Sequence, residues 1–253
     1  MNAPTQTTLL RAIALAAMLA GAAIGAAHGA SNTTVGGSAA VAAGQHVVFD
    51  CSKAQVSCAI TAIGEKSSNA VVNADISGPD AADVQIIQTP GEPHFTVFIN
   101  GTGSQPNSFG SWLASIFHVS SWFRSNATAL VTLRVPERNP LDISDTNGNV
   151  SVRGVHARIH ISTVNSDVRS SDSSEFDIST VNGSVHARIP AGTPKVHAST
   201  VNGAITLLVP SGFNTKVKTS TVNGHTHNPF DGANGAGSVN LSTVNGSITV
   251  TRS

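Results

Sequence analysis

The sequence predicts an all-β fold, and more specifically a parallel β-helix (a solenoid) of about six to nine coils. Three observations lead to this prediction. A Ser-Thr-Val-Asn-Gly string recurs at a near-constant spacing, and the residues that flank it alternate between apolar and polar. The composition is rich in Gly, Ser, Thr, Asn and Val and contains no Tyr. Such a composition favours short strands and turns over helices.

The repeated string marks six equivalent positions in the C-terminal half of the chain. Taking the Asn of each copy as its origin, successive copies lie 18, 17, 20, 21 and 22 residues apart. The first copy, at 144–148, is degenerate, and the second, at 162–166, ends in Ser instead of Gly. We expect the six asparagines to form one ladder along the stack: Asn147, Asn165, Asn182, Asn202, Asn223 and Asn245.

The residues around each Asn follow a period of two. Positions six and four before the Asn, and three after it, are mostly apolar, whereas the position five before it is polar in every copy. Alternation of this kind indicates strands with one face in the core and the other in water. Each unit of the region 141–253 therefore consists of a strand, an Asn-Gly corner, a second strand and a looser turn.

Two arrangements satisfy this description. Asn-Gly between alternating strands is the strongest short hairpin signal, so the units could form an antiparallel β-meander. The repeated Ser-Thr-Val ahead of the Asn favours a parallel β-helix, because identical side chains stacked on one another form ladders.

Residues 30–140 contain weaker units, which we interpret as degenerate coils. The segment Val84–Ile99 is predicted to be one coil with Pro90 and Gly91 at its corner, and Ala129–Pro136 a strand that leads into the repeats. Between them, 100–127 is predicted to be an insertion with one short amphipathic helix, since its apolar residues are spaced i, i+3, i+4, i+7 and i+8. Its aromatic side chains would brace the sheets or contact a partner; they include Phe109, Trp112 and Phe117.

The first 29 residues have the features of a secretory signal peptide. One basic residue, Arg11, precedes a short apolar run, which ends in small residues. No segment of the mature chain is expected to span a membrane. Cys51 and Cys58 are the two cysteines of the chain, and in an oxidising compartment we expect them to form a disulfide. The predicted location is extracytoplasmic: periplasm, cell surface or secreted.

The charge balance excludes some classes of partner. The chain has 14 basic and 14 acidic residues, and only 11% of its residues are charged. Without a basic excess, nucleic acid is not an expected partner. No motif for a cofactor is present, because no Gly-rich phosphate loop joins a strand to a helix.

Few residues are candidates for chemistry. Asp142, His160 and Asp177 share one outward column and are the best candidates for acid catalysis, although solvated surface charges are the simpler explanation of them. His225 and His227 point the same way on a strand and are weak candidates for a metal site. We interpret three arginines as scattered surface charges: Arg153, Arg169 and Arg188.

The run from Val135 to Ile143, followed by repeated Ile-Ser-Thr-Val-Asn-Gly-Ser-Val, resembles a bacterial family of unknown function described as adhesin-like or β-strand-repeat proteins. The similarity covers about residues 84–253. It implies a right-handed β-helix on an exported protein that is often tied to the cell envelope, and it implies no catalytic motif.

The expected function is therefore that of a non-enzymatic envelope or cell-surface protein, an adhesin-like binding or structural module. Its partner would be a glycan or a protein at the cell envelope, and no cofactor is expected. A polysaccharide-acting enzyme that uses Asp142, His160 and Asp177 is the alternative, and a component of envelope-stress sensing is another.

Overall fold

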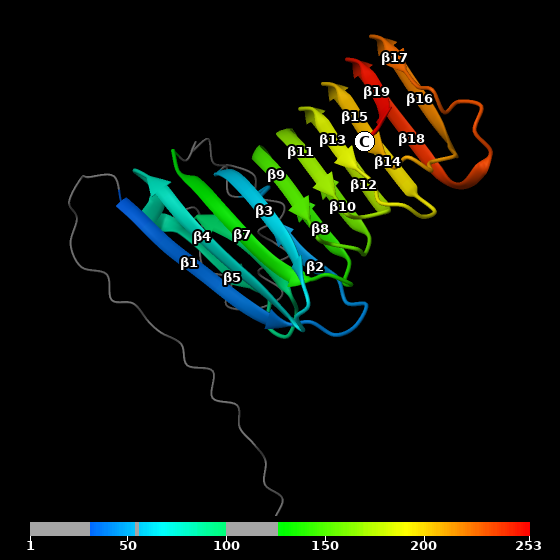
Figure 1. Ribbon diagram of the computed structural model, residues 1–253. Helices are drawn as coiled ribbons and strands as arrows, with labels where there is room; N and C mark the ends of the chain where they lie inside the picture. Colours follow the sequence, from blue (N-terminus) through cyan, green and yellow to red (C-terminus); the bar gives the residue numbers. More distant parts are fainter. Residues whose placement is uncertain (1–30, 54–55, 100–125) are drawn as a thin grey trace, which may run out of the picture.

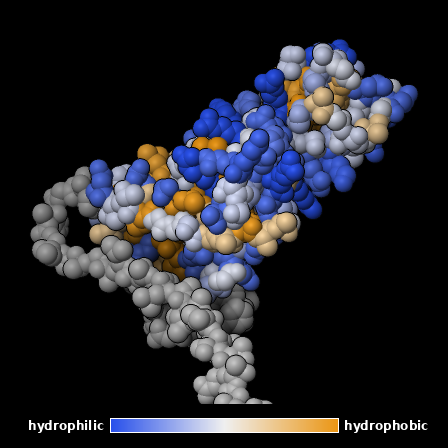
Figure 2. Space-filling view, turned by 60° about the horizontal axis from the view of Figure 1, so that its bottom comes forward, coloured by the Kyte–Doolittle hydropathy of each residue, from blue (hydrophilic) through white to orange (hydrophobic). Residues whose placement is uncertain are grey.

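The computed structural model describes residues 31–53, 56–99 and 126–253, and in this part of the chain the regular structure is β-strand apart from one 3-10 turn, η1 (Ala81–Asp83). Within these residues the strands form two sheets, which we call sheet A and sheet B. Apolar side chains from both sheets meet in one core. Both sheets extend along the length of an elongated molecule (Figures 1 and 2).

Sheet A has ten strands and sheet B nine within the described ranges. In spatial order, sheet A consists of β1 (Ser31–Ala40), β4 (Asn69–Gly78), β7 (Thr128–Pro136), β3 (Ser57–Glu65), β9 (Asn147–Arg153), β11 (Asn165–Ser171), β13 (Val185–Arg188), β15 (Ile205–Val209), β19 (Ile248–Arg252) and β17 (Thr226–His227). Sheet B consists of β16 (Thr215–Asn223), β18 (Gly235–Asn245), β14 (Lys195–Asn202), β12 (Glu175–Asn182), β10 (Ile159–Ser162), β8 (Leu141–Ser144), β2 (Val47–Asp50), β6 (His94–Ile99) and β5 (Val84–Gln88).

Each repeat unit supplies one strand to sheet B and the next strand to sheet A, with the Asn corner between them. Equivalent strands of neighbouring units pair in parallel, so that Ile161 lies opposite Ile143 on one side and Ile178 on the other. All pairings within 141–252 are parallel. The antiparallel meander is therefore wrong for the repeats.

The parallel register stacks equivalent core residues in columns. The apolar members of two columns are almost completely buried, as alternation predicts. The column four before the Asn consists of Ile143, Ile161, Ile178, Ala198, Leu241 and Thr219, and the column three after it of Val150, Val168, Val185, Ile205, Ile248 and Thr226.

The units are not stacked in the order of the sequence. The last unit, β18–β19, lies between β14–β15 and the preceding unit β16–β17, which ends the molecule (Figure 1). The two core columns explain this order, because the end unit has Thr219 and Thr226 where the others have apolar side chains. An end unit that faces water on one side needs a polar outer surface.

The N-terminal part departs from the predicted coils. Strands β2 and β3 pair in parallel with both of their neighbours. Strands β6 and β7 are parallel to β2 and β3 on one side but antiparallel to β5 and β4 on the other, and β1 pairs antiparallel with β4. The predicted coil at Val84–Ile99 is instead an antiparallel hairpin of β5 and β6. Gly91 has a φ of 79°, and the turn closes through a hydrogen bond from the Thr89 amide to the His94 carbonyl. A tight Pro-Gly turn of this kind reverses the chain instead of turning a corner.

Two predictions fall outside the described residues. The signal peptide at 1–29 is one, and the amphipathic helix with Phe109, Trp112 and Phe117 is the other. The strand predicted at Ala129–Pro136 is confirmed as part of β7.

Candidate functional site

The six corner asparagines form one continuous ladder on the outside of the molecule. Each side-chain amide after that of Asn147 donates a hydrogen bond to the amide oxygen of the preceding Asn in the stack, and the N···O distances lie between 2.7 and 2.9 Å. The spatial order of the ladder is Asn147, Asn165, Asn182, Asn202, Asn245 and Asn223. Because these hydrogen bonds all run in the same direction along the stack, they fix the orientation of the corners that they join.

A row of exposed valines lies beside the Asn ladder. The Val of each Ser-Thr-Val-Asn string points outward, with 39% to 73% of its surface exposed. The row consists of Val164, Val181, Val201, Val244 and Val222, with Thr146 at the equivalent position of the first unit. We call the Asn ladder and this Val row together the corner stripe. An apolar row that faces water makes no contribution to the core and offers a contact surface.

The Thr of the string donates a hydrogen bond to a neighbouring unit in four copies, whereas the buried hydroxyl of Thr163 has no hydrogen-bond partner. Thr200 donates to the Gly183 carbonyl at 2.9 Å, and Thr243 donates to the Gly203 carbonyl at 3.2 Å. Both hydroxyls are nearly buried. The repeated sequence therefore has one inward residue that joins units and two outward residues that form the corner stripe.

The first unit replaces this Thr by Asp145, which lies against the disulfide. The structure joins Cys51 and Cys58, and the two sulfur atoms and a carboxylate oxygen of Asp145 all lie within 4.8 Å of one another. Only 2% of Asp145 is exposed; one carboxyl oxygen accepts a hydrogen bond from Ser166, and the other has no partner. Burial raises the pKa of the Asp145 carboxyl, and the hydrogen bond from Ser166 opposes this shift. Because the sulfur atoms are bonded to each other, they do not offer thiolates to a metal.

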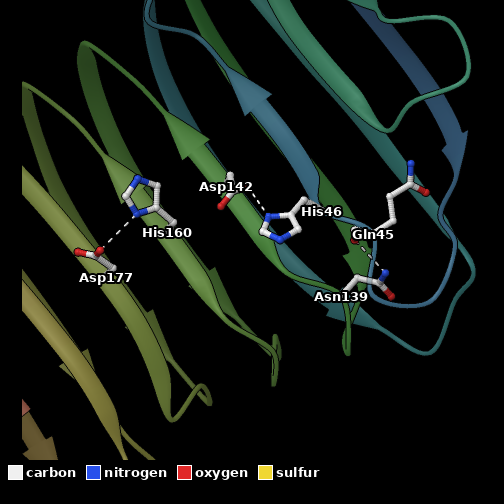
Figure 3. Close-up of polar contacts among 6 residues, drawn as sticks. All are labelled: Gln45, His46, Asn139, Asp142, His160 and Asp177. Atoms are coloured by element: carbon white, nitrogen blue, oxygen red, sulfur yellow. Dashed lines mark hydrogen bonds and ion pairs between the residues drawn. The ribbon is translucent and has the colours of Figure 1, made fainter. Parts of the chain in front are cut away.

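The outer face of sheet B carries a row of alternating His and Asp side chains (Figure 3). His46 Nδ1 lies 2.7 Å from an Asp142 carboxyl oxygen, and His160 Nδ1 lies 3.7 Å from a carboxyl oxygen of Asp177. Asn139 positions His46, because its amide donates to the carbonyls of Ala42 and Gln45 in the turn that precedes it. The structure thus brings Asp142, His160 and Asp177 onto one exposed face, as the sequence predicts, in adjacent parallel strands.

The weak metal candidates lie apart from further ligands. His225 and His227 are both exposed at the outer end of sheet A. Among the described residues, no third His, Cys, Asp or Glu completes a metal-ligand group with them.

One cluster of charged side chains was not predicted from the sequence, which indicated only scattered charges. Arg153, Arg169 and Arg188 come from three consecutive units and lie on the outer face of sheet A. Their separations in sequence, 16 and 19 residues, are each about one repeat, and this spacing was the available signal. Arg169 and Arg188 line a shallow hollow of about 140 Å³ together with His186, Thr206 and Leu208.

Comparisons with known proteins give similarity of fold at a low level. No protein-family model matches the chain, and no curated protein matches it. A candidate cell adhesion protein from Clostridium sporogenes has 12% identity and a TM-score of 0.46, over 87% of this chain and 100% of that one. A candidate adhesin from Bacteroides fragilis has 12% identity and a TM-score of 0.39, over 87% of this chain and 97% of that one. Similarity at this level does not bear on function. Within the described ranges, no helix is long and apolar enough to cross a membrane.

Proposed function

We propose that this protein is a non-enzymatic, exported, adhesin-like module that binds an extended polymer of the cell envelope along its corner stripe. The observation that carries the proposal is the outward repetition of the same Val and Asn side chains in successive parallel units. The predicted signal peptide and the Cys51–Cys58 disulfide support an extracytoplasmic location. We further propose that the units wind as a parallel β-helix, with the two sheets as its faces.

Repetition gives this surface its binding mechanism. Neighbouring parallel strands lie about 4.8 Å apart, so each unit adds one apolar contact and one amide at a constant spacing. A single contact of this kind is weak, but contacts along one polymer act together because the second forms at a high effective concentration. The amide ladder holds the corners in place before binding, which reduces the entropy lost on association.

The His–Asp row of sheet B is a weaker candidate for a binding site than the corner stripe, and its geometry does not suit catalysis. Asp142 and Asp177 lie on either side of the β10 strand that carries His160, on an exposed sheet face. General acid catalysis of glycoside hydrolysis needs two carboxyl groups facing each other across a bound sugar. Two carboxyl groups that point outward in parallel from one sheet do not provide this geometry.

The corner stripe is tested by replacing three of its valines. We expect the triple variant Val181→Ser, Val201→Ser and Val244→Ser to cosediment with isolated bacterial cell-wall sacculi about tenfold less than the unchanged protein. The fold should be retained, because exposed substitutions usually change stability by less than about 0.5 kcal/mol. Cosedimentation over a range of protein concentrations measures the effect.

The matched control is Leu130→Ser with Ile87→Ser. These two side chains are also exposed and apolar, 58% and 38% respectively, and both lie outside the corner stripe. Equal losses in both variants, or failure of the unchanged protein to bind the sacculi, would contradict the proposal.

A further inference from the structure

The arginine cluster on sheet A is compact because of the parallel register. Arg169 lies opposite Ser151 in β9 and opposite His186 in β13. Ser171 lies two residues after Arg169 on the same face of β11. Arg188 of β13 lies opposite Ser171 on one side, and continuing the register of β9 by one residue places Arg153 opposite it on the other side. With neighbouring strands about 4.8 Å apart, the three side chains start within about 10 Å of one another. All three are exposed.

The three guanidinium groups are not neutralised by direct ion pairs. In the described part of the chain, no carboxylate lies within ion-pair distance of Arg153, Arg169 or Arg188, whereas Arg134 pairs with Glu65 and Lys195 with Glu175. Two carboxyl groups lie near the cluster without pairing with it. Asp167 is two residues before Arg169 on the same face of β11 and accepts a hydrogen bond from the Ser184 amide, and Asp172 follows β11 directly. The pKa of the Asp172 carboxyl is lowered mainly by a hydrogen bond from Ser171, with smaller effects from the charges of His156 and Arg188.

The surroundings of the cluster suit a sugar polymer. Arg169 and Arg188 stand at a shallow, open hollow, which Thr206 and Leu208 also line. The outward column through Arg169 continues with Ser151, Thr206 and Thr249, whose hydroxyls can exchange hydrogen bonds with sugar hydroxyls. An open hollow on a sheet face admits a side group of a chain that passes over it, and it does not enclose a small metabolite.

We propose that this cluster binds the carboxylate groups of an acidic glycan. The planar guanidinium group of Arg donates two parallel hydrogen bonds to one carboxylate, and three such groups on consecutive units match a polymer with repeated acidic sugars. The chain has no net charge, so this is local recognition and not the long-range attraction that nucleic acid requires. The inference rests on the proposed function in taking an envelope polymer as the partner, but it concerns a different face.

Titration with polygalacturonate, a polymer of repeated sugar carboxylates, tests this inference. We expect the full protein to bind polygalacturonate, to bind neutral dextran much less, and to bind less tightly as salt concentration rises. The double variant Arg169→Gln and Arg188→Gln should bind polygalacturonate about tenfold less tightly or worse. The control is the double variant Arg138→Gln and Lys218→Gln, which removes two exposed charges outside the cluster and should bind like the unchanged protein.

Several outcomes would overturn the inference. It fails if polygalacturonate does not bind, if both double variants lose affinity equally, or if DNA or dextran sulfate binds as tightly as polygalacturonate. The Val181, Val201 and Val244 triple variant separates the two proposals. Retained polygalacturonate binding in that variant supports an arginine site that is independent of the corner stripe.

Discussion

Replacing Gly203 by alanine is expected to destabilise the fold by more than about 3 kcal/mol. A Cβ at this position would lie 2.1 Å from the carbonyl oxygen of Gly183 in the neighbouring unit. Backbone cannot move aside as a flexible side chain does, so the two units would have to separate. Separation would also break the hydrogen bond from Thr200 to the same carbonyl.

The matched control is Gly212→Ala. A Cβ at Gly212 meets nothing within 4 Å, and this glycine lies in the turn between β15 and β16. We expect chemical denaturation to show a large loss for Gly203→Ala and a change of less than about 0.5 kcal/mol for Gly212→Ala. Two equally stable variants would show that the units do not approach each other as closely as described.

Replacing Asp145 by threonine is expected to stabilise the protein at pH 7 by about 1 to 2 kcal/mol. Asp145 is buried with one carboxyl oxygen unpartnered, whereas the other units have Thr at this position. Burial raises its pKa above the ordinary 3.8, so the folded state keeps this proton to a higher pH than the unfolded chain does. The contribution of Asp145 to stability is therefore greatest at acid pH and falls as pH rises through 3.8 and above.

The gain from Asp145→Thr should accordingly be small at pH 3 and grow toward pH 7. Urea denaturation at several pH values measures it, with Asp231→Asn as the control because Asp231 is exposed in a loop. A gain that is the same at every pH, or a variant that is less stable at pH 7, would contradict the buried position of this carboxyl group.

The sequence predicted the repeat units well because their signal is local. Alternation around each Asn gives both strands of a unit, and the ladder of Ser, Thr, Val and Asn favoured parallel stacking, which the structure shows. The Asn-Gly signal does not show that Gly183 and Gly203 are needed because a carbonyl oxygen of the neighbouring unit occupies the space of a Cβ. Contacts between units could not be derived from one unit alone.

The order of the units was not predicted, although its cause is visible in the sequence. Any unit can pair with any other through the same backbone hydrogen bonds, so strand patterns do not specify neighbours. Thr219 and Thr226 in two core columns mark the unit that ends the stack. The arginine cluster was missed for a related reason, since residues 16 to 19 positions apart become neighbours only once the units are stacked.

The proposed function depends on one continuous row of corners, and paired cysteines test that row most directly. Val201 and Val244 lie in adjacent strands, β14 and β18, whose registers pair their neighbours Thr200 with Thr243 and Asn202 with Asn245. Val222 lies in β16, on the far side of β18. We predict that Val201→Cys with Val244→Cys forms a disulfide under mild oxidation, since adjacent strands bring Cα atoms within the usual range of about 4.4 to 6.8 Å. Val201→Cys with Val222→Cys should stay reduced; cross-linking of this second pair instead of the first would contradict the stacking order and the continuous corner stripe.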